Sequence, residues 1–194
     1  MSQTNLLPSI IATLITAYLL VGLIWFVRWR PDYRHTRHTI SELGERGSAD
    51  GARVNALLFA PVGLALLAMG GWAMLESVRQ PLREPFGYLA LAIGVGYLGG
   101  AIFPCDPGSP MQGSWRQQLH NLAGGVEYVG GALAIYLAAN LLTDATFLGS
   151  WLLASAGVVA LVAVGLSFTL FFPVRGLIQR IGELTLFTNV IVLA

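Results

Sequence analysis

The sequence predicts an all-α fold, an integral membrane bundle of six transmembrane helices. Of its 194 residues, 55% are hydrophobic and only 11% are charged, and the mean hydropathy is +0.68. Soluble domains carry roughly 25% charged residues. A helix that spans a bilayer needs about 20 mainly apolar residues, and the chain has several runs of that length. We expect residues 1–194 to form a single transmembrane domain.

The apolar runs give approximate bounds for the six spans. The first, residues 8–27, is too long for the apolar region of a signal peptide. No positive charge precedes it in "MSQTNLL", so we expect a retained helix. The other five spans are expected at residues 54–75, 86–104, 119–142, 147–172 and 177–194.

The loop between the first two spans contains "HTISELG", residues 38–44. Thr39 and Glu42 have the spacing of a capping box, in which a hydroxyl and a carboxylate satisfy backbone N–H groups at a helix start. A glycine commonly follows the last residue of a helix. We therefore expect a short amphipathic or loop helix here that ends at Gly44 or Gly47.

The basic residues are all arginines, and the two faces of the predicted bundle share them unevenly. One face carries Arg79 and Arg83, while the loops at residues 28–53, 105–118 and 173–180 place the other nine on the opposite face. By the positive-inside rule, the arginine-rich face is expected in the cytoplasm and the N-terminus outside. A net charge of +1 predicts no nucleic-acid partner.

Glycines are frequent within the predicted spans, as in "AGGVEYVGG". Small residues let helix backbones approach closely in a membrane. We expect Gly125 and Gly130–Gly131 to lie in a tight helix contact.

Polar side chains gather on the arginine-rich face, and all three histidines are among them. The residues that could carry chemistry are His35, His38, Ser41, Glu42, Cys105, Asp106, His120, Glu127, Arg175, Arg180 and Glu183. Glu127 and Glu183 fall inside spans, where a charge costs several kcal/mol unless it is paired or hydrated. Arg180 could pair with Glu183 three residues later. Glu127 needs a partner on another helix or a bound proton.

Three segments, "HTISELG", "FPCDPG" and "HNLAG", together resemble the DUF998 family of small bacterial and archaeal membrane proteins. The resemblance covers nearly the whole chain, and the matching positions are His38, Ser41, Glu42, Gly44, Pro104, Asp106 and His120. It implies a prokaryotic inner or plasma membrane location and no established activity. The layout is also similar to that of the Frag1/DRAM/Sfk1 proteins, some of which are associated with lipid remodelling, so membrane lipid is the expected partner.

One hypothesis is a hydrolase or acyl-transfer enzyme that acts on lipid. A zinc ion, the one cofactor considered, would be held by His38, Asp106 and His120, because imidazole and carboxylate suit zinc and three protein ligands leave a position for water. Glu42 or Glu127 would act as the base, and Ser41 could polarise a carbonyl. In a version without metal, Cys105 would be the nucleophile and His120 its base.

A second hypothesis is a lipid-binding or transport protein without chemistry. The guanidinium groups of Arg37, Arg116, Arg175 and Arg180 would then hold a phosphate or carboxylate head group.

A third hypothesis is a structural or accessory subunit. It expects hydrogen bonds from His38 to Asp106 and from His120 to Glu42 that fix the first loop to the bundle. The sequence predicts no particular protein partner for any of the three hypotheses.

Overall fold

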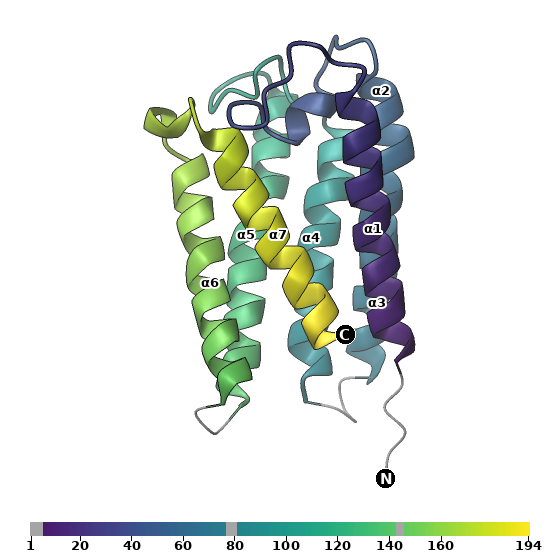
Figure 1. Cartoon of the computed structure of the whole chain (residues 1–194), viewed down its shortest axis with the longest axis vertical. Helices are drawn as coiled ribbons and strands as arrows, with labels where there is room; N and C mark the ends of the chain where they lie inside the picture. The colour runs from purple at the N-terminus through teal and green to yellow at the C-terminus, as the bar shows by residue number, and fades with distance from the viewer. Residues whose placement is uncertain (1–5, 77–80, 143–145) are drawn as a thin grey trace.

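The computed structural model describes residues 6–76, 81–142 and 146–194, and every long element in these ranges is a helix (Figure 1). The six spans are α1 (Leu7–Val27), the continuous stretch of α2 (Gly51–Val54), η2 (Asn55–Phe59) and α3 (Ala60–Glu76), then α4 (Arg83–Ile102), α5 (Trp115–Asn140), α6 (Phe147–Leu166) and α7 (Arg175–Leu193). Each span is long and apolar enough to cross a membrane. The predicted six-span, all-α fold is confirmed. Arg79, used in the charge count, lies outside the described residues.

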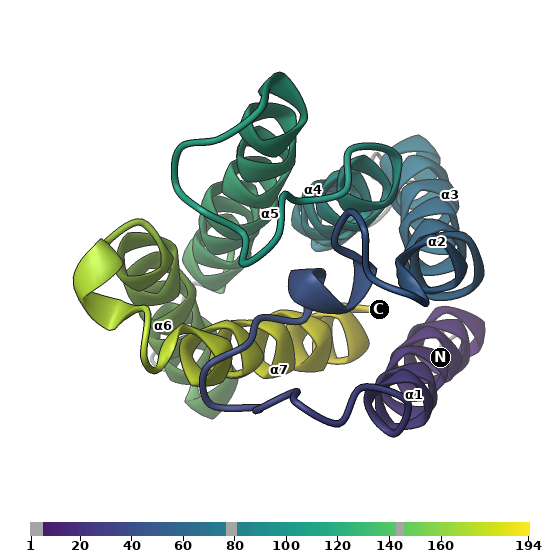
Figure 2. The ribbon, with the colours of Figure 1, turned by 90° about the horizontal axis from the view of Figure 1, so that it is seen from above.

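The helices from α3 to α6 pack as consecutive neighbours, and α7 closes the bundle against α6, α1 and α4. The view from above shows α7 between α6 and α1 (Figure 2). In the side view α7 is tilted relative to the other helices (Figure 1). The spans α4 and α7 are the most buried, whereas α1 and α6 keep most of their surface exposed. The exposed side chains of these outer helices are mainly apolar, as expected for contact with lipid.

Glycines bring α3 and α4 into close contact. A Cβ added to Gly63 would lie 2.6 Å from the backbone N of Leu98, and one added to Gly70 would lie 2.9 Å from the carbonyl oxygen of Gly87. Any larger residue at these positions would force the two backbones apart. This contact is the small-residue packing that the glycine-rich sequence indicates.

The connections at residues 28–50, 103–114 and 167–174 gather at one end of the bundle, here called the polar end (Figure 1). The first of them crosses the bundle as far as the start of α7 before it returns to α2 (Figure 2). There the backbone N of Leu177 donates to the carbonyl of Thr36 at 3.0 Å. A Cβ on Gly176 would lie 2.7 Å from the carbonyl oxygen of His35, so a glycine allows this close approach.

The expected short helix in the first connection is the single turn η1 (Ser41–Gly44). The Glu42 carboxylate accepts from the backbone N of Thr39 at 2.9 Å, which confirms that this side chain reaches back as in a capping box. In a full capping box the Thr39 hydroxyl would accept from a backbone N–H. Here that hydroxyl donates to the Glu42 carboxylate instead. The buried Asn55 ties η1 to the second span, because its Nδ2 donates to the carbonyl of Gly44 at 2.8 Å.

The helix ends differ from the expected bounds mainly at the polar end. The helix α5 begins at Trp115, four residues before the expected 119, because the Ser114 hydroxyl accepts from the backbone N of Gln117 and caps the first turn. The helix α6 ends at Leu166 instead of residue 172, and the short turn η3 (Thr169–Phe171) follows it.

Candidate functional site

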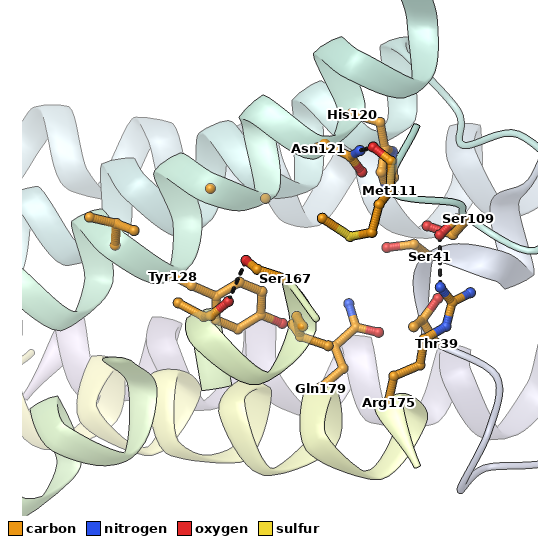
Figure 3. Close-up of a pocket in the computed structure, with 15 residues that line it drawn as sticks. Thr39, Ser41, Ser109, Met111, His120, Asn121, Tyr128, Ser167, Arg175 and Gln179 are labelled. Atoms are coloured by element: carbon orange, nitrogen blue, oxygen red, sulfur yellow. Dashed lines mark hydrogen bonds between the residues drawn. The ribbon is translucent and has the colours of Figure 1, made fainter. Parts of the chain in front are cut away.

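A cavity of about 180 Å³ lies at the polar end, between α5, α6 and α7 and beneath the first connection (Figure 3). Polar side chains line one part of it and apolar surface lines the rest. Its lining residues are Thr39, Ser41, Ser109, Met111, His120, Asn121, Gly124, Gly125, Tyr128, Val129, Ala163, Leu166, Ser167, Arg175 and Gln179. Segments from distant parts of the sequence therefore meet at one site.

Arg175 is the charged anchor of the polar part. Its guanidinium donates to Glu42 Oε1 at 2.7 Å and to the carbonyl oxygens of Ser109, at 2.8 Å, and Gly108. Both members of the Arg175–Glu42 ion pair are buried. The pair joins the first connection, the loop before α5 and the first turn of α7. Because Glu42 neutralises Arg175, the guanidinium offers little net charge to an anionic ligand.

His120 lines the cavity, and a hydrogen bond of its ring indicates which nitrogen carries the proton. Its Nδ1 lies 3.0 Å from the carbonyl oxygen of Phe103. A carbonyl can only accept, so Nδ1 carries the proton in the neutral ring, and Nε2 is left as an acceptor. The neighbouring Asn121 donates to the carbonyl of Met111 at 3.0 Å and so holds the loop before α5 over the cavity.

Ser41 and Gln179 complete the polar part from the connection and from α7. The Gln179 Oε1 accepts from the backbone N of Ile40 at 2.6 Å, which fixes the connection above the cavity. The Ser41 carbonyl accepts from the Cys105 thiol. Within the described residues, the Ser41 hydroxyl has no hydrogen-bond partner, so it is available to a ligand.

The apolar part is formed by Gly124, Gly125 and Val129 on α5 and by Ala163 and Leu166 on α6. A Cβ added to Gly124 or Gly125 would meet no atom within 4 Å. The expected helix contact at Gly125 is therefore wrong, because this glycine leaves open the wall of a cavity. The expectation is correct at Gly131, where an added Cβ would lie 2.5 Å from Leu186 on α7.

The three predicted zinc ligands are not brought together. His38 Nδ1 accepts from the backbone N of Arg34, at 3.0 Å, and His38 does not line the cavity. Asp106 accepts from Ser114, and His120 pairs with Phe103. Across residues 6–76, 81–142 and 146–194, no group of three His, Cys, Asp or Glu side chains is placed to hold a metal ion. The first connection follows a path to α7, which carries His38 away from α4 and α5.

Asp106 organises the loop before α5. Its carboxylate accepts from the backbone N and the hydroxyl of Ser114, at 2.7 and 2.9 Å, and from Arg46 at 3.2 Å. These hydrogen bonds, led by the backbone N–H of Ser114, hold the pKa of Asp106 below its usual value. Asp106 therefore positions the start of α5 and does not reach the cavity.

Cys105 is buried and is not an activated nucleophile. Burial, with Glu45 and Glu42 nearby, raises the pKa of its thiol to about 12, whereas a catalytic thiol needs a lowered pKa. Its Sγ donates to the carbonyl of Ser41 at 3.5 Å, and His120 is engaged with Phe103. The proposed Cys105–His120 couple is therefore not formed.

The other predicted arginines lie outside the cavity. Arg180 donates to the carbonyl oxygens of His35 and His38 and to the hydroxyl of Tyr33, so it clamps the first connection instead of pairing with Glu183. Arg116 is exposed and lies over the ring of Trp115.

The remaining predicted residues also lie away from the cavity. Arg37 is exposed on the connection. The expected hydrogen bonds from His38 to Asp106 and from His120 to Glu42 are absent among the described residues, because each of these side chains has another partner. Glu127 is buried beside Glu183, deeper in the bundle than the cavity's polar part.

The structure thus places Ser41, His120 and Arg175 of the predicted set at the cavity. Sequence reasoning missed Thr39, Ser109, Met111, Asn121, Gly124, Tyr128, Ser167 and Gln179. One signal was present in the sequence: Asn121 and Gly124 belong to "HNLAG", one of the three segments that carry the family resemblance. Tyr128, Ser167 and Gln179 have no local pattern that marks them, because only the packing of α5, α6 and α7 brings them together.

A family model matches most of the chain. The model of the family described as "Protein of unknown function (DUF998)" matches residues 10–194. No curated protein and no solved structure matches the chain.

Proposed function

We propose that this chain, which belongs to the DUF998 family, binds an amphiphilic molecule whose polar head enters the cavity between α5, α6 and α7. The observation that carries the proposal is the division of the cavity into a polar part under the first connection and an apolar part between α5 and α6. A lipid near the membrane surface has the same division between head group and chain.

The residues at the outer edge of the cavity support the entry of a ligand from the membrane. Gly125, Val129 and Ser167 line the cavity and are also exposed on the outside of the bundle. An apolar chain could therefore lie along α5 and α6 in contact with lipid while its head occupies the cavity. Pockets for small molecules are commonly of this kind, mainly apolar with a few placed polar groups.

The chemistry of the polar part favours a neutral head group. Arg175 is the one residue with a permanent charge among those that line the cavity, and Glu42 neutralises it. Two groups that a ligand could meet are the Ser41 hydroxyl, a donor and acceptor, and His120 Nε2, an acceptor in the neutral ring. A hydroxyl, amide or ester head group matches these partners better than a phosphate or carboxylate, so the proposal departs from the arginine-bound anion of the sequence hypothesis.

The test is to identify the lipids that remain with the protein after purification in mild detergent. Wild type is compared with Gly125→Leu, which fills the cavity, and with Gly157→Leu, a matched control on the exposed face of α6. A Cβ at either glycine meets no atom within 4 Å, so neither change disturbs the packing at that point. Native mass spectrometry would give the amount and identity of the bound lipid.

We expect wild type and Gly157→Leu to retain a neutral lipid and Gly125→Leu to lose it. Equal retention by all three proteins would place any binding elsewhere and overturn the proposal. Preferential retention of an anionic lipid that Gly125→Leu loses would support the site and contradict the neutral head group.

Hydrolysis or acyl transfer on the bound molecule is a second candidate function. It is supported by the presence of Ser41 and His120 at the same cavity and by the tautomer of His120, which leaves Nε2 as a base. The Ser41 hydroxyl would donate to the carbonyl of an ester or amide, and His120 would take the proton of a water, or of an acceptor alcohol in acyl transfer, as its oxygen bonds to the carbonyl carbon. The acyl C–O or C–N bond would then break, and His120 would return the proton to the leaving alcohol or amine.

Turnover of neutral ester and amide lipids by purified protein tests this candidate. Loss of product in His120→Ala and Ser41→Ala, with lipid retention kept and with His35→Ala unaffected, would support it. Unchanged turnover in His120→Ala would contradict it.

A further inference from the structure

Two buried carboxyl groups lie on different helices, deeper in the bundle than the polar part of the cavity. Glu127 on α5 and Glu183 on α7 are each 6% exposed, and their side chains are in hydrogen-bonding contact. No ion pair joins either of them to another of the described residues. A charge within a span is costly without a cation or water, and two adjacent carboxylates would add repulsion to that cost.

The hydrogen bonds around the two carboxyls differ. Glu183 accepts from the hydroxyl of Tyr128 at 2.6 Å and from the hydroxyl of Tyr97 at 2.8 Å, one on each oxygen. These donors stabilise Glu183 as a carboxylate. Glu127 Oε1 is buried and receives no hydrogen bond from the described part of the chain. Of the two groups, Glu127 is thus the one suited to be the acid, and Glu183 the one suited to accept from it.

We propose that Glu127 binds a proton and holds it against the Glu183 carboxylate, so that the pair forms a proton-binding site inside the membrane-spanning bundle. The proposal does not depend on the lipid-binding function, because it uses neither a ligand nor the apolar part of the cavity.

The helix α4 is shaped to hold this pair. A Cβ on Gly96 would lie 2.6 Å from the Cβ of Glu127, so only glycine at this position leaves room for the glutamate. The Tyr97 ring, which donates to Glu183, is itself held by edge-to-face contacts with Phe59 and Phe187. Gly96 therefore leaves space for the Glu127 side chain, and Tyr97 is held in position to donate to Glu183.

A small cavity of about 40 Å³ runs from Glu183, the acceptor of the pair, toward the polar end. It is lined by Glu183, Tyr97, Gly96 and Gly100 near the pair and by Ser41, His120 and Gln179 toward the polar end, with Ile40, Phe59 and Gly124 completing it. A cavity that holds a water needs roughly 10–15 Å³. A water here could exchange the proton with the polar end.

The titratable groups that face the pair are few. Among the described residues they are Tyr97 on α4, Tyr128 on α5 and, across the small cavity, His120 on α5. The segments that pack from η2 and α6 contribute the apolar Phe59 and Val162. The proton is therefore held by the carboxyl pair and not by a larger charged network.

The experiment is infrared spectroscopy of the purified full chain, which resolves the C=O stretch of a protonated carboxyl from the bands of carboxylates. Wild type is compared with Glu127→Gln, Glu183→Gln and the exposed control Glu84→Gln as the pH is raised, in the presence and absence of sodium ions. In Glu127→Gln the new amide can donate to Glu183, so that Glu183 stays ionised.

We expect the protonated-carboxyl band in wild type, Glu84→Gln and Glu183→Gln at neutral pH, and its loss in Glu127→Gln. At high pH the band should fall about tenfold per pH unit, as for a single titrating proton. A band that persists in Glu127→Gln, or that sodium ions remove at constant pH, would overturn the proposal.

A second measurement covers the case in which Glu127→Gln does not fold. A hydrophobic carbodiimide modifies protonated carboxyls, and mass spectrometry of wild-type peptides locates the product. Modification at Glu127 in excess of Glu183 and Glu84 supports the assignment. A wild-type protein with no protonated-carboxyl band, or with modification mainly at Glu183, contradicts it.

Discussion

Glu42 Oε1 lies 2.7 Å from the Arg175 guanidinium, and the side chains are only 5% and 9% exposed. The two residues are separated by 133 positions in the sequence. Their ion pair fixes the first connection to the start of α7, and Arg175 extends the link to Ser109 and Gly108. The position of the cavity's polar part depends on this pair.

Breaking the pair should destabilise the protein strongly. Removing one partner leaves an uncompensated buried charge, which typically costs about 3–5 kcal/mol. We expect this loss in the free energy of unfolding for Arg175→Met, measured by denaturant titration in detergent. The double change Glu42→Gln with Arg175→Met should recover most of it, because neither charge remains.

The control for this prediction is Arg53→Met in the exposed Asp50–Arg53 pair, where the arginine side chain is 75% exposed. An exposed pair contributes about 0–1 kcal/mol, so a small change is expected. A loss in Arg53→Met as large as that in Arg175→Met would show that burial does not determine the effect.

Gly96→Ala should disrupt the carboxyl pair, while Gly71→Ala should be tolerated. The added methyl group would collide with Glu127 in the first variant and meet nothing within 4 Å in the second. Overpacking of this kind costs about 1–3 kcal/mol, whereas alanine in an open helical position gains up to about 1 kcal/mol over glycine. Thermal unfolding of both variants tests the expected opposite signs, and equal effects would contradict the close contact.

Cys105 should resist alkylation in the folded protein. Its pKa, raised by burial to about 12 from a usual value of 9.0, leaves almost no thiolate at pH 8. We expect iodoacetamide to modify Cys105 slowly in native protein and rapidly after denaturation, as followed by mass spectrometry. Because the folded pKa is the higher one, burial of the neutral thiol stabilises the fold fully below pH 9, and this contribution is lost as the pH rises toward 12. Rapid alkylation of native protein would contradict the buried environment.

The spans could be predicted from the sequence because their cause is local. Each span is a run of apolar residues that satisfies its backbone hydrogen bonds within one helix. The predicted helix bounds were less accurate at the polar end, where a single side chain can determine the residue at which a helix begins. The Ser114 hydroxyl caps α5, which begins four residues before the apolar run.

The candidate site was only partly predictable, because its contacts join segments that are distant in sequence. The hydrogen bond from the Thr39 backbone N to the Glu42 carboxylate could be predicted, because it depends only on a spacing of three residues. Its ion pair with Arg175 depends on the path of the first connection over the bundle, which no local pattern specifies. The same path separates His38 from Asp106 and explains why the predicted zinc site is not formed.

Asp106 should make the stability of the loop before α5 depend on acid pH. The Ser114 backbone N–H and hydroxyl, with Arg46, hold the pKa of the folded Asp106 below its usual 3.8. Since the folded pKa is the lower one, the stabilising contribution is present above pH 3.8 and is lost as the pH falls through the folded value. Asp106→Asn should therefore lower the melting temperature at neutral pH, and the difference from wild type should shrink below pH 3.8.

Asp50→Asn is the matched control, because the Asp50 carboxylate pairs with the exposed Arg53, three residues later in the chain. Its melting temperature should stay close to that of wild type across the same pH range. A difference between wild type and Asp106→Asn that does not change with pH would mean that the carboxylate charge is not what holds the Ser114 N–H. The lower melting temperature of Asp106→Asn would then have another cause, such as a changed hydrogen-bond geometry at the start of α5.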